Sequence, residues 1–258
     1  GCLAKLGSLC LDASEAAVTI GTSGAVRVTL PKPLIDTERM IFSYLLDATT
    51  FVCGGAINNG GNVLQWLANK FLVGDAVVVE DLFAEAAKVP AGSDGLLFLP
   101  YLNGERAPIW DEKSSGVFFG IKTVHEQPHF ARAAMEGICF ALMEILSIIE
   151  GASGVLHKIK FSGAVAESMV MLQMLADVSG KEVVVHEEGD ASALGAAYLA
   201  LKDLGAIENY ANIKAGASKT IQPDTANAAV YKKQFAIYRT LYPALKQAMH
   251  SVHLPTTT

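Results

Sequence analysis

The longest regular pattern of apolar positions lies just past the middle of the chain. Apolar residues recur every three or four positions after Pro128, and the remaining helical faces between 139 and 146 are largely apolar as well. A helix that is apolar nearly all round is a core helix, and proline suits its first turn. The pattern therefore predicts a long buried helix that begins near Pro128. The short apolar run 117–119, between two glycines, predicts a buried strand before it.

Alternating apolar and polar residues predict strands in the first part of the chain. Residues 16–30 alternate on both sides of a glycine turn at 21–24, which is the pattern of a β-hairpin. Two further strands are predicted at 41–46 and 51–54. A glycine-rich loop then leads into a helix that starts near Asn62.

Strands and helices alternate through the rest of the sequence. The predicted elements are a short helix at 80–89, a strand at 96–99, a strand at 158–161, a helix at 169–178, a strand at 183–185, a helix from Asp190 to Gly205, and a terminal helix with a packing stripe from Tyr231 to Met249, kinked or ended near Pro243. No linker or internal repeat divides this order. It predicts one compact α/β domain of mixed strands and helices.

The composition argues against several classes of protein. With 258 residues and 51% hydrophobic content, the chain can bury a substantial core. A formal net charge of −6 and the lack of a Lys/Arg run argue against a nucleic-acid surface. Four cysteines without CxxC spacing are typical of reduced thiols in an intracellular protein. The longest apolar run, 138–149, is shorter than the roughly 20 residues that span a bilayer. The chain begins at Gly1 without methionine, which predicts a fragment or a processed chain.

Three glycine-containing turns carry the candidate chemistry. The turn 21–24 is either an ordinary hairpin connection or a place where backbone N–H groups and two hydroxyls bind an anion. Glycines at 54–55 and 60–61 precede a helix N-terminus, which also favours an anion. The strand, turn and helix across 158–178 present backbone N–H groups in the same way. Each turn alone has a structural explanation, so the hypothesis of an anion-binding site rests on the three turns together.

The order of residue types between 116 and 136 resembles the second signature of the FGGY family of carbohydrate kinases. Ten positions meet the signature at its fixed spacing: Gly116, Phe118, Gly120, Ile121, His129, Phe130, Ala133, Ala134, Met135 and Glu136. Ten constrained positions are much harder to satisfy by chance than one glycine motif. The segment 100–108, PYLNGERAP, is similar to the family too, although its Glu105–Arg106 pair is otherwise typical of a surface ion pair. Residues 192–197 resemble the family's closing helix.

The resemblance implies a fold and a place in a larger enzyme. Such kinases have two actin-like ATPase (ribonuclease-H-like) domains with ATP in the cleft between them, and residues 1–258 look like the C-terminal, nucleotide-binding one. The N-terminal, sugar-binding domain would lie outside this chain. The parent enzyme would transfer the γ-phosphoryl of Mg²⁺-ATP to a hydroxyl of a sugar or sugar acid. Asn58-Asn59-Gly60-Gly61 most resembles the gluconate kinase branch, and xylulose is the second candidate substrate.

The resemblance also implies which residues bind the nucleotide. The implied set is Gly21, Thr22 and Gly24 of the first turn, Gly60, Gly61 and Gln65 of the second, and Gly163, Ala164 and Ser168 of the third. Thr22 is expected to contact the terminal phosphates. Ala164 stands where the family usually has glycine, and Glu167 where it usually has a basic residue. These two departures predict weaker ATP binding.

No catalytic residue and no metal ligand are expected in this chain. In the family the base is an aspartate just upstream of the Gly-Thr hairpin, and the resemblance places it immediately before Gly1. Asp12 is interpreted as a surface or capping residue. We therefore expect the 258 residues alone to bind nucleotide weakly and not to phosphorylate sugar. The resemblance implies ATP, a small sugar or sugar acid and the N-terminal domain of the same enzyme as partners. It implies a cytoplasmic protein that binds neither nucleic acid nor a membrane. A homodimer is compatible with this interpretation.

Two alternatives from other classes stay open at this point. An actin- or Hsp70-like nucleotide-binding module would share the fold and the glycine hairpins, but those relatives lack the 116–136 pattern and the Asn-Gly-Glu-Arg-x-Pro segment. A kinase-derived domain that has lost catalysis and senses sugars would keep both. The presence or absence of the upstream aspartate separates this sensor from an enzyme.

Overall fold

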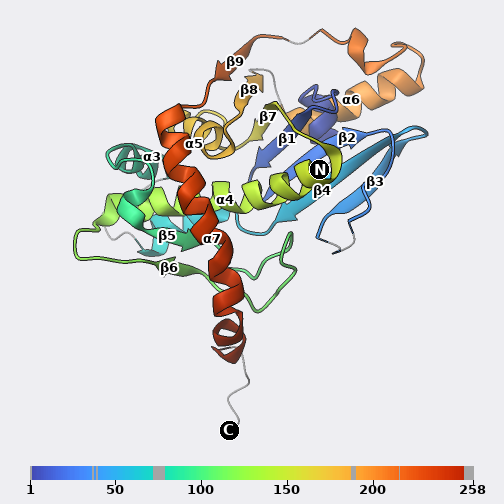
Figure 1. Ribbon diagram of the computed structural model, residues 1–258. Helices are drawn as coiled ribbons and strands as arrows, with labels where there is room; N and C mark the ends of the chain where they lie inside the picture. Colours follow the sequence, from blue (N-terminus) through green and yellow to red (C-terminus); the bar gives the residue numbers. More distant parts are fainter. Residues whose placement is uncertain are drawn as a thin grey trace.

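The computed structural model describes residues 2–36, 38, 40–71, 79–186, 190–214 and 216–252. Within them, a seven-stranded mixed sheet has the order β3-β4-β2-β1-β7-β8-β9 (Figure 1). The strands are β1 (Glu15–Ile20), β2 (Gly24–Leu30), β3 (Phe42–Asp47), β4 (Thr50–Ile57), β7 (Lys158–Gly163), β8 (Glu182–His186) and β9 (Ser218–Ile221). The expected mixed sheet flanked by helices is confirmed.

The hairpin predicted at 16–30 forms the centre of this sheet. β1 and β2 pair antiparallel up to the Ile20–Gly24 pair, which closes the glycine turn. On its other side β1 runs parallel to β7, in a register that places Ile20 opposite Gly163. Parallel neighbours end at the same edge of a sheet. The first glycine turn and the turn after β7 therefore leave the sheet side by side.

Helices cover both faces of the sheet. The long helix α4 (Gln127–Ser153) packs on the face that carries Val18 and Val26, and it is buried over most of its length, as its apolar pattern predicts. α1 (Cys2–Gly7) and α6 (Ala191–Asp203) lie over the opposite face, where Thr19 points. The side chain of Asp190 caps α6 by accepting from the Ser192 N–H at 2.7 Å, as the sequence predicts.

α1 and α6 cross at two glycines. An ideal Cβ on Gly7 would lie 1.7 Å from the carbonyl oxygen of Ala191, and one on Gly195 would lie 1.9 Å from that of Leu3. Neither position can hold a side chain unless the backbones separate. The small residues of α6 thus allow α6 to pack closely on α1.

The remaining elements extend the core beyond the sheet. They are α2 (Gly61–Trp66), a π-helical turn (Leu67–Phe71), α3 (Val79–Ala87), β5 (Leu97–Leu99), β6 (Val117–Phe119), α5 (Met169–Ser179), two short 3₁₀ turns (Ser93–Gly95 and Tyr210–Asn212) and α7 (Thr225–Val252). β5 and β6 form a separate two-stranded sheet.

One expectation for these elements was wrong, and another is reduced to one of its two alternatives. The strand at 117–119 was expected to be buried, yet Phe119 is 45% exposed because β6 pairs only with β5 and has an open outer side. Of the two alternatives predicted for the terminal helix near Pro243, an end is excluded, because α7 continues through Pro243 to Val252; a kink stays a prediction. Proline removes one backbone hydrogen bond from a helix, and the burial of Tyr238, Leu241 and Met249 on both sides of it holds α7 together.

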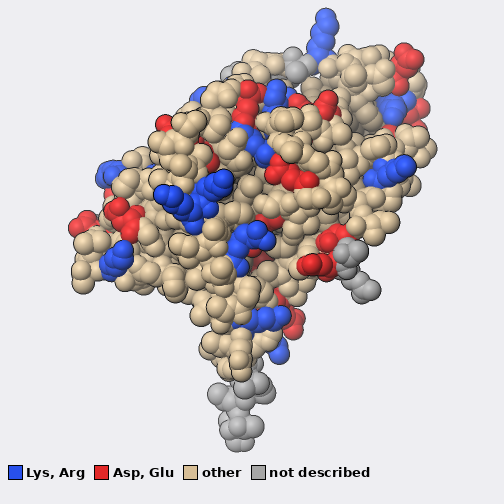
Figure 2. All heavy atoms as spheres, in the orientation of Figure 1, with Lys and Arg blue, Asp and Glu red and all other residues tan. Residues whose placement is uncertain are grey.

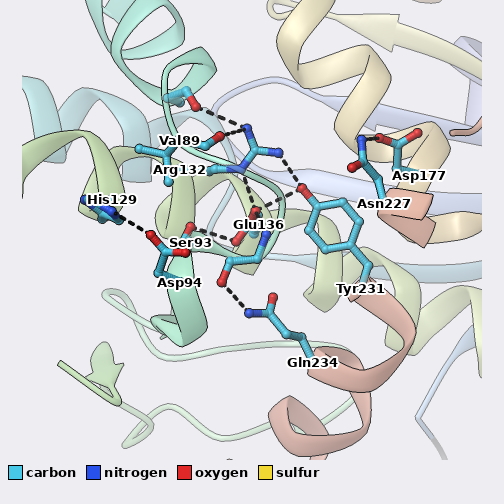
Figure 3. A network of polar contacts seen from close by, with 12 residues as sticks. Val89, Ser93, Asp94, His129, Arg132, Glu136, Asp177, Asn227, Tyr231 and Gln234 are labelled. Carbon is cyan, nitrogen blue, oxygen red and sulfur yellow. Dashed lines mark hydrogen bonds and ion pairs between the residues drawn. The ribbon is translucent and has the colours of Figure 1, made fainter. Parts of the chain in front are cut away.

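A buried polar cluster joins α3, α4 and α7 (Figure 3). The Arg132 guanidinium donates to Glu136 at 2.8 Å, to the Tyr231 hydroxyl at 2.7 Å and to the carbonyl oxygens of Ala86 and Val89 at 3.1 and 2.8 Å. Glu136 also accepts from the Tyr231 hydroxyl at 2.9 Å and from the backbone and side chain of the 92–93 turn. This cluster fixes the end of α3 against the core.

Neither positive nor negative charge dominates the face drawn in Figure 2, where Lys/Arg and Asp/Glu side chains are interspersed. Among the described residues, no helix combines the length and the apolar character that crossing a membrane requires.

Candidate functional site

The first two glycine turns are joined by backbone hydrogen bonds. The Gly61 N–H donates to the carbonyl oxygen of Gly21 at 2.7 Å, and the Asn62 N–H donates to that of Thr22 at 3.1 Å. The turn that begins at Gly163 lies beside them through the β1–β7 pairing. Three segments far apart in sequence thus meet at one edge of the sheet, as the hypothesis of a shared site requires.

These bonds correct one detail of the sequence prediction. The start of the second helix was expected to offer its unpaired N–H groups to an anion. In the structure two of those groups, on Gly61 and Asn62, are already used by the hairpin, and α2 has only six residues. The second loop therefore braces the first one instead of forming an anion site of its own.

Several glycines are required by the close approach of backbones. An ideal Cβ on Gly60 would lie 2.6 Å from the carbonyl carbon of Ser23, and one on Gly61 would lie 2.7 Å from the oxygen of Gly21. Gly163 has φ +122°, and a Cβ there would lie 2.1 Å from the oxygen of Ile20. These three positions need glycine for the fold itself.

Gly21 differs from these glycines. A Cβ built there meets nothing within 4 Å, and its φ lies outside the left-handed region. The fold therefore does not require glycine at this position. Gly21 and Thr22 border a cavity of about 620 Å³, so the missing side chain leaves room for a ligand to approach the hairpin backbone.

The cavity is lined by the hairpin and by a mixture of polar and apolar side chains. Five residues predicted from the sequence line it: Gly21, Thr22, Gly61, Gln65 and Ala164. Its apolar wall comes from Leu64, Trp66, Val79, Phe83 and Val165, and its other polar residues are Asn62, Asn69, Lys70 and Glu80. The Thr22 hydroxyl suits a phosphate, and the apolar lining residues suit a flat ring. The residues present fit a nucleoside polyphosphate.

The other predicted residues lie outside this cavity. Gly24 is buried in β2, where a Cβ would press on Ile57 and Leu142. Gly60 supports the contact between the loops. Ser168 caps α5 by accepting from the Met171 N–H at 3.3 Å. Gly163 borders a second cavity of about 360 Å³, on the side of α1 and α6, which Ala164 lines as well. The nucleotide role of these residues stays a prediction.

The two departures from the family pattern differ in position. Ala164 is exposed and lines both cavities, so its methyl group occupies space at the site. Glu167 is exposed and lines neither cavity. Its negative charge is therefore not among the lining residues of either cavity.

The sequence did not single out the apolar wall. Phe83 and Val79 lie on α3, for which the sequence predicted only a short helix at 80–89, and Trp66 directly follows the predicted Gln65. An aromatic residue adjacent to a predicted site residue is the one signal that could have found Trp66. Nothing in the local sequence distinguishes Phe83 from an ordinary packing residue.

The segment 100–111 packs against the second glycine loop. The buried carboxylate of Glu105 accepts from the Asn58 N–H, from the Asn59 amide at 2.9 Å and from the Arg106 N–H at 2.8 Å. Burial raises the pKa of Glu105 above its usual value, against the lowering effect of these donors. Asn59 also donates to the Gly104 carbonyl oxygen at 2.7 Å. Glu105 is thus a buried connection between two loops and not the surface ion pair that its sequence context suggests.

The carboxylates of the described residues offer no evident metal centre. Among them, no group of three or more His, Cys, Asp or Glu side chains is arranged to hold a metal ion. Asp12 accepts from the Ser14 N–H at 2.7 Å and is exposed, as its interpretation as a surface or capping residue allows.

Comparison with known proteins identifies the family. Residues 16–204 match the model of the FGGY family of carbohydrate kinases, C-terminal domain. The chain is 37% identical over 257 residues to a gluconokinase from Bacillus licheniformis, an alignment that covers 95% of this chain and 50% of that protein. Its structure superposes on a gluconate kinase from Lactobacillus acidophilus with a TM-score of 0.91 at 34% identity, covering 98% of this chain and 51% of the other.

A xylulose kinase is equally similar in structure. The ligand-bound xylulose kinase from Lactobacillus acidophilus also has a TM-score of 0.91, at 33% identity, with 98% of this chain and 51% of that chain covered. The chain spans about half the length of the relatives it matches. The expected actin-like ATPase fold, with its mixed sheet flanked by helices, is confirmed by these superpositions. By the 16–204 match and these identities, the chain belongs to the FGGY family of carbohydrate kinases and carries the family's C-terminal domain.

Proposed function

We propose that the 620 Å³ cavity binds ATP and that residues 1–258 are the nucleotide-binding half of an enzyme that phosphorylates gluconate to 6-phosphogluconate. The observation that carries this proposal is Gly21, a glycine that the fold does not need and that leaves the hairpin backbone open to the cavity. Membership of the kinase family implies the use of ATP, typically with Mg²⁺.

Each wall of the cavity has a role in this proposal. The hairpin at Gly21 and Thr22 holds the terminal phosphates, with the Thr22 hydroxyl as one donor. Phe83 and Val165 enclose the base from opposite segments, while Gln65 offers an amide at the boundary. When bound, Mg²⁺ neutralises charge on the phosphates. Positioning and desolvation are what such residues contribute to phosphoryl transfer.

We propose that the catalytic base and most contacts to the sugar come from residues outside the 258 residues of this chain. The catalytic base would be an aspartate that precedes Gly1, at the start of α1. α1 packs on β1 and β2 behind the hairpin, which would bring a base at its start towards the terminal phosphate. An N-terminal domain of the same enzyme would supply most contacts to the sugar and close the cleft.

Xylulose is the second candidate acceptor, and the equal superposition on a xylulose kinase supports keeping it. Gluconate ranks first because the Asn58-Asn59-Gly60-Gly61 loop resembles the gluconate kinase branch and because the gluconokinase shares more identical residues over this chain than a xylulose kinase of Staphylococcus epidermidis, 37% against 31%. An actin-like module without a sugar substrate is disfavoured by the match to a kinase family.

An acceptor panel tests the proposed reaction. The product of the complete reading frame is incubated with Mg²⁺-ATP and gluconate, xylulose, ribulose or glycerol, and ADP release is measured. We expect gluconate to have a kcat/KM at least about tenfold above that of any other acceptor, a difference of about 1.4 kcal/mol in transition-state stabilisation. The 258-residue chain assayed alone is the matched control and is expected to be inactive.

Two results would contradict the proposal. A preference for xylulose would replace the substrate and keep the reaction class. A protein that binds ATP but phosphorylates none of the acceptors would favour the nucleotide-binding module or the sugar sensor.

A further inference from the structure

A further cavity lies where the 100–111 segment meets the second glycine loop and the end of α7. Its volume is about 510 Å³, and its lining residues are Asn58, Asn103, Glu105, Arg106, Trp110, Asp111, Glu112, Lys113 and His250. None of these residues lines the nucleotide cavity. The proposed function so far gives them no role, although several of them carry polar groups that the protein leaves unused.

The Arg106 guanidinium is only partly satisfied. Its Nη2 donates to the carbonyl oxygen of Ile57 at 2.9 Å. Among the described residues, neither its Nε, which is buried, nor its Nη1 has a hydrogen-bond acceptor. The neighbouring carboxylate of Glu105 instead accepts from three other N–H groups. Guanidinium N–H groups are normally paired, so Arg106 brings unused donors to the wall of the cavity.

Trp110 is held with its ring partly in the open. The residue is 53% exposed, and its φ of +46° lies in the left-handed region, which bulky residues rarely adopt. Its indole N–H donates to the carbonyl oxygen of Met40 at 3.0 Å, which fixes the orientation of the ring. Backbone conformations of this kind are found mostly at functional sites. The fixed ring offers a flat apolar surface to the C–H groups of a ligand.

Two asparagines add acceptors to the same cavity. The Asn58 amide nitrogen donates to the Asn103 carbonyl oxygen at 3.3 Å. The side-chain oxygens of Asn58 and Asn103 accept no hydrogen bond from the part of the chain that the structure describes. Hydroxyl groups donate to such oxygens and accept from N–H groups. Donors, acceptors and a flat apolar surface together suit a polyhydroxylated carbon chain.

The wall that α7 contributes is fixed by the buried carboxylate of Asp111. This carboxylate accepts from the Tyr242 hydroxyl at 2.8 Å and from the Lys113 N–H at 3.0 Å, and it contacts the His250 Nε2 at 2.6 Å. Like Glu105, it is therefore occupied by groups of the protein itself. The cavity is preformed, and its two buried carboxylates are already engaged.

The cavity lies at the same edge of the sheet as the hairpin. Ile57, which accepts from Arg106, pairs with Gly24 at the end of the glycine turn. Asn58 precedes Gly61 by three residues, which span at most about 11 Å, and the Gly61 N–H is bonded to the Gly21 carbonyl oxygen. None of the lining residues belongs to α1, at whose start the base is proposed. The cavity is thus near the hairpin without adjoining α1.

We propose that this cavity binds the end of the acceptor that is remote from the phosphorylated hydroxyl. Arg106 and Asn58 contact its oxygen atoms, and the Trp110 ring contacts its C–H groups. The inference rests on the proposed function and adds acceptor contacts from this chain to those of the N-terminal domain. In gluconate the remote end carries the carboxylate, which suits the unused N–H groups of a guanidinium. In xylulose it carries hydroxyl and keto oxygens.

The test is a calorimetric titration of gluconate into the product of the complete reading frame and into its Arg106→Gln and Trp110→Ala variants. We expect Arg106→Gln to bind gluconate about 10- to 100-fold more weakly, the usual effect of losing a hydrogen bond to a charged group. Trp110→Ala should bind it about tenfold more weakly, and Trp110→Phe, which keeps a flat ring, should recover most of the affinity. The affinity for Mg²⁺-ATP should stay unchanged in all three variants.

Arg239→Gln is the matched control, because Arg239 is exposed on α7 and lines neither cavity. Unchanged gluconate affinity in both Arg106→Gln and Trp110→Ala would overturn the subsite and leave the kinase proposal intact. An equal loss of gluconate and Mg²⁺-ATP affinity would also overturn it, because it would indicate a general effect on the fold.

Two further outcomes separate the subsite from the proposed reaction. If the protein prefers xylulose, the same losses in xylulose affinity would support the subsite, and their absence would overturn it. Gluconate binding that depends on Arg106, in a protein that phosphorylates no acceptor, would support the subsite and contradict the proposed reaction. A protein that binds no acceptor at all would contradict both.

Discussion

The Arg132→Met variant is expected to lose about 3–5 kcal/mol of unfolding free energy, the usual cost of removing one partner from a buried ion pair. Methionine keeps much of the side-chain volume but leaves the Glu136 carboxylate, whose side chain is 1% exposed, without its charged partner. The carbonyl oxygens of Ala86 and Val89 and the hydroxyl of Tyr231 also lose a donor. Urea denaturation followed by circular dichroism measures the loss.

Two further variants test whether the loss of unfolding free energy comes from breaking the buried ion pair or from removing any arginine. Arg239→Met removes an exposed arginine from α7 and is expected to change stability by no more than about 0.5 kcal/mol. The double variant Arg132→Met with Glu136→Leu removes both charges and should recover part of the stability. A loss below about 1 kcal/mol in Arg132→Met would show that the cluster in Figure 3 does not hold α3 in place. The wall of the cavity that Phe83 provides would then need another support.

The Gly195→Ala variant is expected to be destabilised by about 1–3 kcal/mol, because overpacking a tight contact forces the backbones to shift. The new methyl group would lie 1.9 Å from the carbonyl oxygen of Leu3, and no side-chain rotation can relieve a clash with backbone. α1 would have to move away from α6. Thermal unfolding should show a lower Tm, and phosphoryl transfer by the complete enzyme should fall because α1 adjoins the proposed base.

Gly151→Ala is the matched control for this variant. Gly151 lies in α4, and a Cβ there meets nothing within 4 Å. Alanine at an open helical position is expected to stabilise by about 0.5–1 kcal/mol. Equal stability of the two variants would contradict the view that α1 and α6 depend on a glycine contact.

The sequence predicted the elements whose pattern is set locally. The alternation at 16–30 and the apolar stripe after Pro128 determine β1, β2 and α4, and the structure confirms all three. α1 and β9 were not predicted, because Cys2–Gly7 is short and Ser218–Ile221 carries no alternating pattern. α1 is stabilised by its contact with α6, which lies far away in sequence.

The candidate site was only partly predictable for the same reason. Local sequence indicated that the glycines at 21, 60, 61 and 163 belong to turns. It could not show that the fold requires glycine at 60, 61 and 163 but not at 21. The backbone contacts that decide this come from segments far away in sequence.

The most direct test of the central claim, that the cavity beside Gly21 binds the nucleotide, is a calorimetric titration of the 258-residue chain and its Gly21→Leu variant with Mg²⁺ and a non-hydrolysable ATP analogue. Leucine fits the described backbone at Gly21 but fills the approach to the hairpin. We expect weak, saturable binding by the unmodified chain, at least about tenfold weaker binding by Gly21→Leu at an unchanged Tm, and normal binding by the matched control Gly151→Leu. Equal binding by the unmodified chain and Gly21→Leu, or no binding by either, would contradict the claim.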